Sequence, residues 1–204
     1  MPSYPDKNKL QAVRKRCVIN DQSEDGESMW YVMQVVSGQE NRIVFLVEKM
    51  ISHKILESCF IPVRRLRKKF HGTWQEVTEK LFPGYVFMIS EQPRLLYEEL
   101  KQIPALTRLL GRCEEYFTSL TEKDVRMLEK LRNGTGGNGN LEVEISRIAV
   151  DEGNQIRILS GPLADLEGQI RKVNLHKRIA VVEVEFMGNQ LLVHLGVEMV
   201  EKIE

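Results

Sequence analysis

Cysteine is scarce in this chain of 204 residues, and its placement argues against two common kinds of site. Cys17, Cys59 and Cys113 are odd in number and widely spaced, so they do not provide a disulfide framework. They form no CxxC pair, and the four histidines are equally scattered, so the sequence supports no metal site.

Long apolar runs are absent as well. None approaches the roughly 20 residues that a helix needs to span a bilayer. The polar N-terminus also lacks the apolar segment of a signal peptide. We therefore expect a cytoplasmic protein that makes no contact with a membrane.

Catalytic signatures are missing too. The sequence has no Walker motif, no GxSxG elbow, and no pair of carboxylates at helical spacing beside a basic group. We therefore expect a protein that is not an enzyme and that binds no cofactor.

Net charge is zero, which gives no general attraction to polyanions, but the charge is unevenly distributed. Residues 29–140 carry 17 Lys and Arg against 13 Asp and Glu, whereas residues 141–204 carry 7 against 11. Opposite charges on two segments suggest that each has a different partner.

The pattern of residues 29–132 alternates between strands and helices, which is typical of an α/β sandwich. The expected strands are 30–36, 56–62, two hairpin strands around Phe70–Thr73, 84–90 and 106–110; the expected helices are 38–53, 93–101 and 121–132. Ser37 and Glu40 have the spacing of a capping box. Residues 151–204 show short strands with glycine turns, at 155–159, 167–173, 179–186 and 191–194, which predicts a small barrel without a helix.

The predicted fold class is therefore α+β, with two domains. Residues 133–140 hold four glycines and no apolar anchor, which is typical of a flexible linker. The expected segments are a polar and disordered extension (1–28), an α/β sandwich (29–132), a linker (133–150) and a small β-barrel (151–204).

Two stretches of the first domain carry a family resemblance. In Leu81–Phe87, Pro83 fixes φ and Gly84 tolerates the backbone of an aromatic turn that leads into a strand. Trp30–Glu40 is a strand of large and β-branched residues that stops at a Ser-Gly pair. In this order they resemble the ferredoxin-like NGN domain of the NusG family of transcription elongation factors. Asp151–Gly153 with Ser160–Gly168 resembles that family's KOW module, an SH3-like barrel.

The resemblance implies a docking site for RNA polymerase. In the family, positions matching Trp30, Phe82 and Tyr85 contribute to an apolar depression on which clamp helices of the polymerase dock. The predicted polymerase-binding residues are Trp30, Tyr31, Phe60, Pro62, Phe82, Pro83 and Tyr85. Burial in a hydrophobic core is the alternative for each of these aromatic side chains.

Arg64–Lys69 places five basic residues in six positions and is the leading candidate for nucleic-acid binding. Like charges so close together repel one another unless an anion is present, and arginine forks fit phosphates and guanine edges. Trp74 nearby offers a stacking surface. The predicted nucleic-acid-binding residues are Arg64, Arg65, Arg67, Lys68, Lys69, His71, Lys172, His176, Lys177 and Arg178. A solvated hairpin edge or turn is the alternative.

Three residues of the KOW-like segment are expected to shape a loop without taking part in chemistry. They are Gly161, Pro162 and Gly168, which lie between the first strands of the expected barrel. Gly168 is expected to allow a close approach or a positive φ.

The resemblance therefore implies a transcription elongation and antitermination factor that acts on RNA polymerase, and we expect it to be a monomer. The Arg-rich hairpin, the N-terminal extension and Leu175–Arg178 followed by Met187-Gly188 resemble the LoaP-type antiterminators, which implies selected operons and a leader RNA hairpin. Non-template DNA is a competing ligand, and a second protein partner of the KOW module stays open. The alternatives are a housekeeping NusG-type pausing or termination factor and a ribosome-associated KOW RNA-binding protein.

Overall fold

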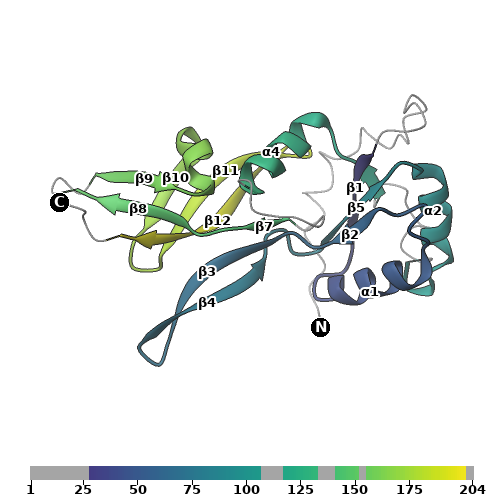
Figure 1. Ribbon diagram of the computed structural model, residues 1–204, viewed down its shortest axis with the longest axis horizontal. Helices are drawn as coiled ribbons and strands as arrows, with labels where there is room; N and C mark the ends of the chain where they lie inside the picture. Colours follow the sequence, from purple (N-terminus) through teal and green to yellow (C-terminus); the bar gives the residue numbers. More distant parts are fainter. Residues whose placement is uncertain (1–27, 107–116, 133–140, 152–154, 201–204) are drawn as a thin grey trace. The chain divides into compact units, whose positions relative to one another are not determined.

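The computed structural model describes residues 28–106, 117–132, 141–151 and 155–200, which fall into two compact units. The first unit comprises Met1–Phe60 and Pro83–Thr121, and the second comprises Ile61–Phe82 and Glu122–Glu204. Figure 1 labels most of their helices and strands. Apart from Ser28, the predicted N-terminal extension lies outside the described residues.

The first unit is built on a four-stranded sheet with the order β2-β5-β1-β6, in which every pairing is antiparallel. Its elements are β1 (Met29–Gln34), α1 (Glu40–Met50), β2 (Ser58–Phe60), β5 (Tyr85–Ser90), α2 (Pro93–Gln102) and β6 (Phe117–Ser119). The predicted α/β character of this part of the chain is confirmed, because helices follow β1 and β5 in the order that the apolar periodicity indicates.

The register between β1 and β5 sorts the aromatic side chains onto two faces. Trp30 and Tyr85 share one face, whereas Tyr31 points to the other. The ring of Tyr31 stacks on Phe117 at 5.2 Å, and Phe117 in turn lies 5.7 Å from the ring of Tyr97 on α2. The face that carries Tyr31 is therefore the one that α2 covers. On the other face Val32, Phe60 and Phe87 are buried as well, so both faces of the sheet contribute to the core of this unit.

The second unit combines a hairpin, a helix and a curled sheet (Figure 1). Its elements are β3 (Val63–Phe70), β4 (Thr73–Lys80), α4 (Glu122–Arg132), β7 (Glu142–Val143), β8 (Ser146–Val150), β9 (Ile156–Ser160), the 3-10 helix η3 (Pro162–Gln169), β10 (Ile170–Asn174), β11 (Ile179–Phe186) and β12 (Asn189–Met199). The strands β8 to β12 form one sheet with the order β10-β11-β12-β8-β9. The predicted SH3-like C-terminal domain is confirmed by this five-stranded curled sheet.

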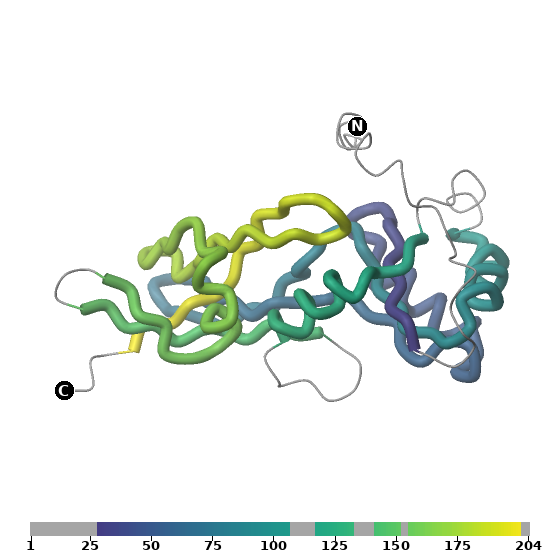
Figure 2. Tube along the Cα trace, turned by 90° about the horizontal axis from the view of Figure 1, so that it is seen from above, coloured from purple at the N-terminus to yellow at the C-terminus, as the bar shows by residue number. Residues whose placement is uncertain are grey.

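Hairpin β3–β4 lies against β12, and a glycine permits the close approach. A Cβ atom added at Gly196 would lie 2.4 Å from the backbone oxygen of Arg65 and 3.3 Å from the Cα of Leu66. A side chain at this position would force the two strands apart. Figure 2 shows the hairpin running beside the barrel strands when the second unit is seen from above.

Several predicted boundaries differ from those of the structure. The sequence predicts a linker as far as residue 150, but two strands, β7 and β8, lie within that range. β7 pairs in parallel with β3, and β8 pairs in parallel with β12, so this part of the expected linker belongs to the sheets. Residues 133–140 of the linker lie outside the described residues. The sequence also assigns the hairpin and α4 to the N-terminal domain, whereas both belong to the compact unit that holds the barrel.

Two predictions about helices are wrong. The barrel is predicted to lack a helix, but η3 connects β9 to β10, with Pro162 in its first turn and Leu163 and Leu166 buried. Leu106 is predicted to begin a strand, but it belongs to a helical turn, and residues 107–110 lie outside the described residues. Strand β11, in contrast, has the predicted bounds.

Candidate functional site

A buried carboxylate holds the aromatic turn of the first unit. Glu40 is fully buried, and its Oε1 accepts a hydrogen bond from the amide of Gly84 while its Oε2 accepts one from the amide of Gly38, both at 2.7 Å. Gly84 has a φ of +86°, and its carbonyl accepts a hydrogen bond from the amide of Val35 at 2.8 Å. The turn before β5 is therefore fixed to the end of β1 in a backbone conformation that favours glycine.

The predicted capping box is only half formed. The residue that precedes α1 is Gln39, and its side chain makes no capping hydrogen bond. Glu40 reaches back to an amide as in a capping box, but its second oxygen binds a turn more than forty residues away in the sequence. The spacing of Ser37 and Glu40 correctly predicted that Glu40 binds a backbone amide before α1. It did not predict the hydrogen bond to Gly84, because no residue near Glu40 in the sequence indicates that partner.

Three of the predicted polymerase-binding residues reach the surface of the first unit. Pro83 is exposed, and Trp30 and Tyr85 are partly exposed. The ring of Trp30 contacts Phe60 edge to face at 5.5 Å, so one side of the indole is anchored. Burial raises the pKa of the Tyr85 hydroxyl, as expected for a phenol that is half sunk into the surface. Trp30 and Tyr85 lie on one face of the sheet and can present a rigid aromatic surface.

The other predicted polymerase-binding residues are buried. They are Tyr31 and Phe60 in the first unit and Pro62 and Phe82 in the second. Burial raises the pKa of Tyr31 to about 12. Phe82 stacks on Phe186 of β11 with 4.9 Å between the ring centroids. Tyr31, Phe60 and Phe82 therefore pack on aromatic rings of the unit that holds each of them.

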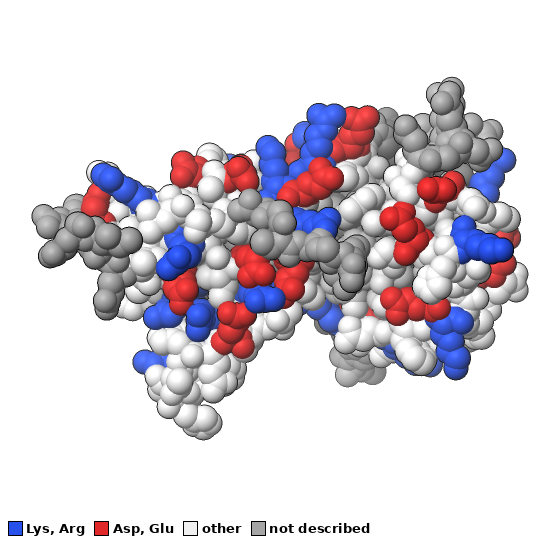
Figure 3. Space-filling view, in the orientation of Figure 1, with Lys and Arg blue, Asp and Glu red and all other residues white. Residues whose placement is uncertain are grey.

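The basic run of β3 is paired with carboxylates. Arg64 lies 3.3 Å from Glu79, which also binds Lys68. Figure 3 shows Lys and Arg side chains interspersed with Asp and Glu side chains above the hairpin that projects at the bottom of the view. The partners of Arg65 are Glu142 at 2.6 Å, Glu76 at 3.2 Å and Glu144 at 3.7 Å, and the partner of Arg67 is Glu198 at 3.1 Å. Most of the positive charge of this run is therefore neutralised within the second unit.

These ion pairs shift the pKa values of the groups involved. The hydrogen bond to Glu142 raises the pKa of Arg65, and the same hydrogen bond lowers the pKa of Glu142 below its ordinary value of 4.5. The hydrogen bond from Lys68 lowers the pKa of Glu79. The lowered pKa values keep Glu79 and Glu142 ionised at neutral pH, where they hold Lys68 and Arg65 in place.

The lowered pKa of Glu142 predicts an acid-dependent loss of stability. Because its folded-state pKa lies below 4.5, the ion pair contributes fully above that pH, and its contribution is lost as the pH falls through the folded-state pKa. We expect Glu142→Gln to flatten the decrease in urea midpoint below pH 4.5 relative to the wild type. Equal pH dependence of the two proteins would show that the pair contributes nothing.

Five predicted nucleic-acid-binding residues have no carboxylate partner among the described residues. They are Lys69, His71, Lys172, His176 and Lys177, and all of them are exposed. Arg178 is partly exposed, and its guanidinium lies 4.1 Å from the centre of the Trp74 ring. The structure therefore joins the turn after β10 to the hairpin, whereas the sequence does not indicate that these segments meet.

The predicted KOW loop depends on one of its two glycines. Gly161 has a φ of +96°, and an added Cβ would lie 2.7 Å from the Cα of Ser146. Gly168 has neither a positive φ nor an atom within 4 Å of an added Cβ, so the prediction for that residue is wrong. It lies in η3, whose helical backbone any residue can adopt.

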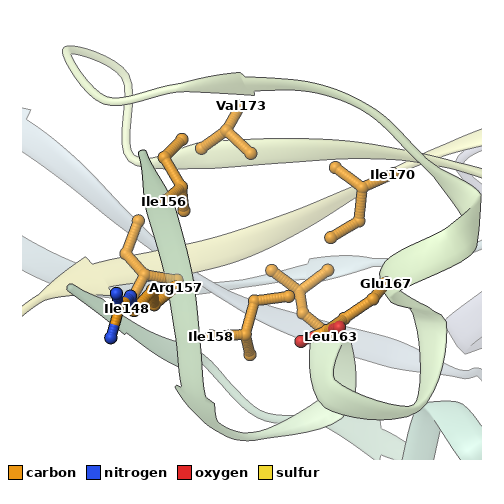
Figure 4. Close-up of a pocket in the computed structure, with 8 residues that line it drawn as sticks. All are labelled: Ile148, Ile156, Arg157, Ile158, Leu163, Glu167, Ile170 and Val173. Atoms are coloured by element: carbon orange, nitrogen blue, oxygen red, sulfur yellow. The ribbon is translucent and has the colours of Figure 1, made fainter. Parts of the chain in front are cut away.

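A pocket of about 540 Å³, lined by aliphatic side chains together with Arg157 and Glu167, opens in the barrel between β9, η3 and β10. Figure 4 shows the isoleucines of β9 and β10 and Leu163 of η3 pointing into this space, with Arg157 and Glu167 at its edges. β9 and β10 are the two end strands of the sheet. The pocket therefore lies where the curled sheet does not close by strand pairing.

Within the described part of the chain, no group of three or more His, Cys, Asp or Glu side chains could hold a metal ion. No helix among the described residues is long and apolar enough to cross a membrane. Cys59 is buried, and this burial raises the pKa of its thiol.

Comparison with known proteins relates most of the chain to one family. The family model described as "Transcription termination factor nusG" matches residues 28–129, which is half of the chain. Relatives named "Transcription termination/antitermination protein NusG" include that of Thermus thermophilus, with 29% identity over 85% of this chain and 97% of that protein. The relative from Neisseria meningitidis is 25% identical over 85% of this chain and 97% of that protein. The solved structure titled "Domain interaction in Thermotoga maritima NusG" has a TM-score of 0.46 and 21% identity, and the match covers 87% of this chain and 98% of that one.

Proposed function

The chain belongs to the NusG family of transcription termination and antitermination factors, and from this premise we propose that it binds RNA polymerase and promotes processive elongation. The observation that supports polymerase binding is the exposure in the first unit of the rings of Trp30 and Tyr85 and of Pro83, which precedes the strand of Tyr85. Anchored aromatic rings on a rigid sheet suit the docking of a partner helix, because little side-chain entropy is lost on binding.

We further propose that the protein is a specialised antitermination factor that recognises a structured leader RNA in the cytoplasm. The support is the set of exposed cations on the hairpin and on the turn after β10, in a chain whose net charge is zero. Local charge can bind nucleic acid where the molecule as a whole has no general attraction to it. Single-stranded DNA of the non-template strand is the competing ligand, and a protein partner of the barrel remains compatible with this role.

Tyr85→Ala is expected to weaken binding to RNA polymerase about tenfold or more. Burial of one large aromatic side chain contributes roughly 1.5–3 kcal/mol to an interface, and Tyr85 lies on the same face of the sheet as Trp30. The dissociation constant of the full chain for purified bacterial core polymerase, measured by fluorescence anisotropy, tests this.

Phe45→Ala is the matched control for Tyr85→Ala. Phe45 is 62% exposed on α1 in the same unit, so its loss removes a similar apolar surface that lies outside the proposed docking surface. If Tyr85→Ala keeps the circular dichroism spectrum and the polymerase affinity of the wild type, the docking assignment is wrong. A pull-down that recovers ribosomes in place of polymerase would favour the ribosome-associated alternative.

A further inference from the structure

The distribution of ion pairs divides the hairpin into two parts. Toward its base, Arg65 and Arg67 are held by Glu142 and Glu198. Toward its tip, Lys69 has no carboxylate partner among the described residues, and the residue opposite it on β4 is Trp74. A polyanion would have to displace carboxylates at the base, whereas at the tip it would meet cations without such partners.

The turn after β10 adds a second cationic segment to this tip. Arg178 lies with its guanidinium 4.1 Å from the centre of the Trp74 ring, which is the geometry of a cation–π contact. Neither an ion pair nor a side-chain hydrogen bond of Arg178 occurs among the described residues, so its donors are available. Lys177 is exposed on the same turn.

The backbone fixes Arg178 in this place. Its φ is +53°, in a region that L residues seldom occupy. Its carbonyl accepts a hydrogen bond from the amide of Val197 at 3.0 Å, and the side chain of Asn174 accepts one from the amide of Lys177 at 2.9 Å. A strained residue held by neighbouring strands is common where a side chain must be presented in one orientation.

We propose that Trp74 and Arg178, flanked by Lys69 and Lys177, form the site at which this protein reads an unpaired nucleotide in an RNA loop. This inference rests on the proposed binding of structured RNA and assigns that binding to the tip of the hairpin. The planar guanidinium, already stacked on an indole, can direct its donors to the edge of a guanine or to a phosphate. The lysines supply contacts to phosphates.

An unpaired nucleotide fits this site better than a duplex does. The deep major groove of an RNA duplex hides its base edges from side chains, whereas loop nucleotides can be splayed out and stacked on aromatic rings or guanidinium planes. Stacking platforms of this kind also bind single-stranded DNA. Comparison of RNA with DNA therefore belongs in the test.

The test measures the affinity of the full chain for a pool of RNA stem-loops with randomised loops. Trp74→Ala and Arg178→Asn are each expected to lower this affinity about tenfold. Asparagine tolerates a positive φ, so Arg178→Asn keeps the turn and remains decisive even if Trp74→Ala disturbs the hairpin. The controls are Arg126→Ala, which removes an exposed arginine from α4, and Arg65→Gln, which removes an ion-paired arginine; both are expected to bind within twofold of the wild type.

The outcomes separate this inference from the proposed function. Wild-type affinity in both tip variants, with a loss in Arg65→Gln, would overturn the assignment to the tip and leave RNA binding intact. Equal affinity of the wild type for a blunt RNA duplex or for single-stranded DNA would overturn the assignment to an RNA loop. If the wild-type protein binds none of these probes, the proposed binding of structured RNA fails together with this inference.

Discussion

Gly161→Ala is expected to destabilise the second unit by about 3 kcal/mol or more, which corresponds to a drop of roughly 10 °C in the melting temperature. With a φ of +96° and a ψ of −178°, Gly161 occupies a region of backbone space that is almost restricted to glycine. An added Cβ would also lie 2.7 Å from the Cα and 2.8 Å from the Oγ of Ser146. That hydroxyl is fully buried and accepts a hydrogen bond from the amide of Leu163, so the clash would break the connection between η3 and β8.

Gly168→Ala, in the 3-10 helix η3 that follows Gly161, is the matched control. It meets nothing within 4 Å and does not need a positive φ, so we expect its melting temperature to equal or slightly exceed that of the wild type. Thermal unfolding followed by circular dichroism compares the two variants. Similar destabilisation by both substitutions would mean that the loop does not depend on the backbone conformation of Gly161.

Glu40→Ala is expected to lower the free energy of unfolding by about 3 kcal/mol. The substitution leaves the buried amide of Gly84 and the part-buried amide of Gly38 without the carboxylate that accepts a hydrogen bond from each of them. Because Gly84 precedes the surface residue Tyr85, the loss should also loosen the aromatic turn. We therefore expect faster hydrogen exchange at the Gly84 amide, in addition to a lower urea midpoint.

Two further variants resolve the role of this carboxylate. Glu40→Gln keeps one acceptor oxygen and should be intermediate in stability, because its amide nitrogen cannot accept the second hydrogen bond. Glu48→Ala removes an exposed glutamate from the same helix, and it should unfold like the wild type. A Glu40→Gln protein as stable as the wild type would contradict the double-acceptor role.

The local elements of this protein are determined by the sequence itself. The alternation of apolar residues in β11 defined its bounds, and Pro93 marked the start of α2. His71 and Gly72 both have positive φ values, as expected of a tight hairpin turn between β3 and β4. Each of these features depends on residues close together in the chain, so propensity and periodicity are sufficient to predict them.

The state of the basic run was decided by tertiary structure. Five cations in six positions predict that an anion binds nearby. In the structure this negative charge comes from carboxylates of β4, of the segment around β7 and of β12. Glu142 and Glu198 lie far from the run in the sequence, so local charge density could not distinguish an internal partner from a nucleic acid. Formation of these partly exposed ion pairs depends on which strands pair, and no local sequence pattern predicts that pairing.

Tertiary structure also decided which aromatic side chains are buried and which are exposed. The sequence shows that Trp30, Tyr31, Phe82 and Tyr85 are large aromatic residues, which by themselves favour a hydrophobic core, whereas the family resemblance favours a docking surface. Strand register placed Trp30 and Tyr31 on opposite faces, and contact with Phe186 buried Phe82. The sequence thus determined which side chains are able to form an aromatic surface. Long-range packing decided which of them stay exposed, because burial depends on contacts between residues that meet only after the chain has folded.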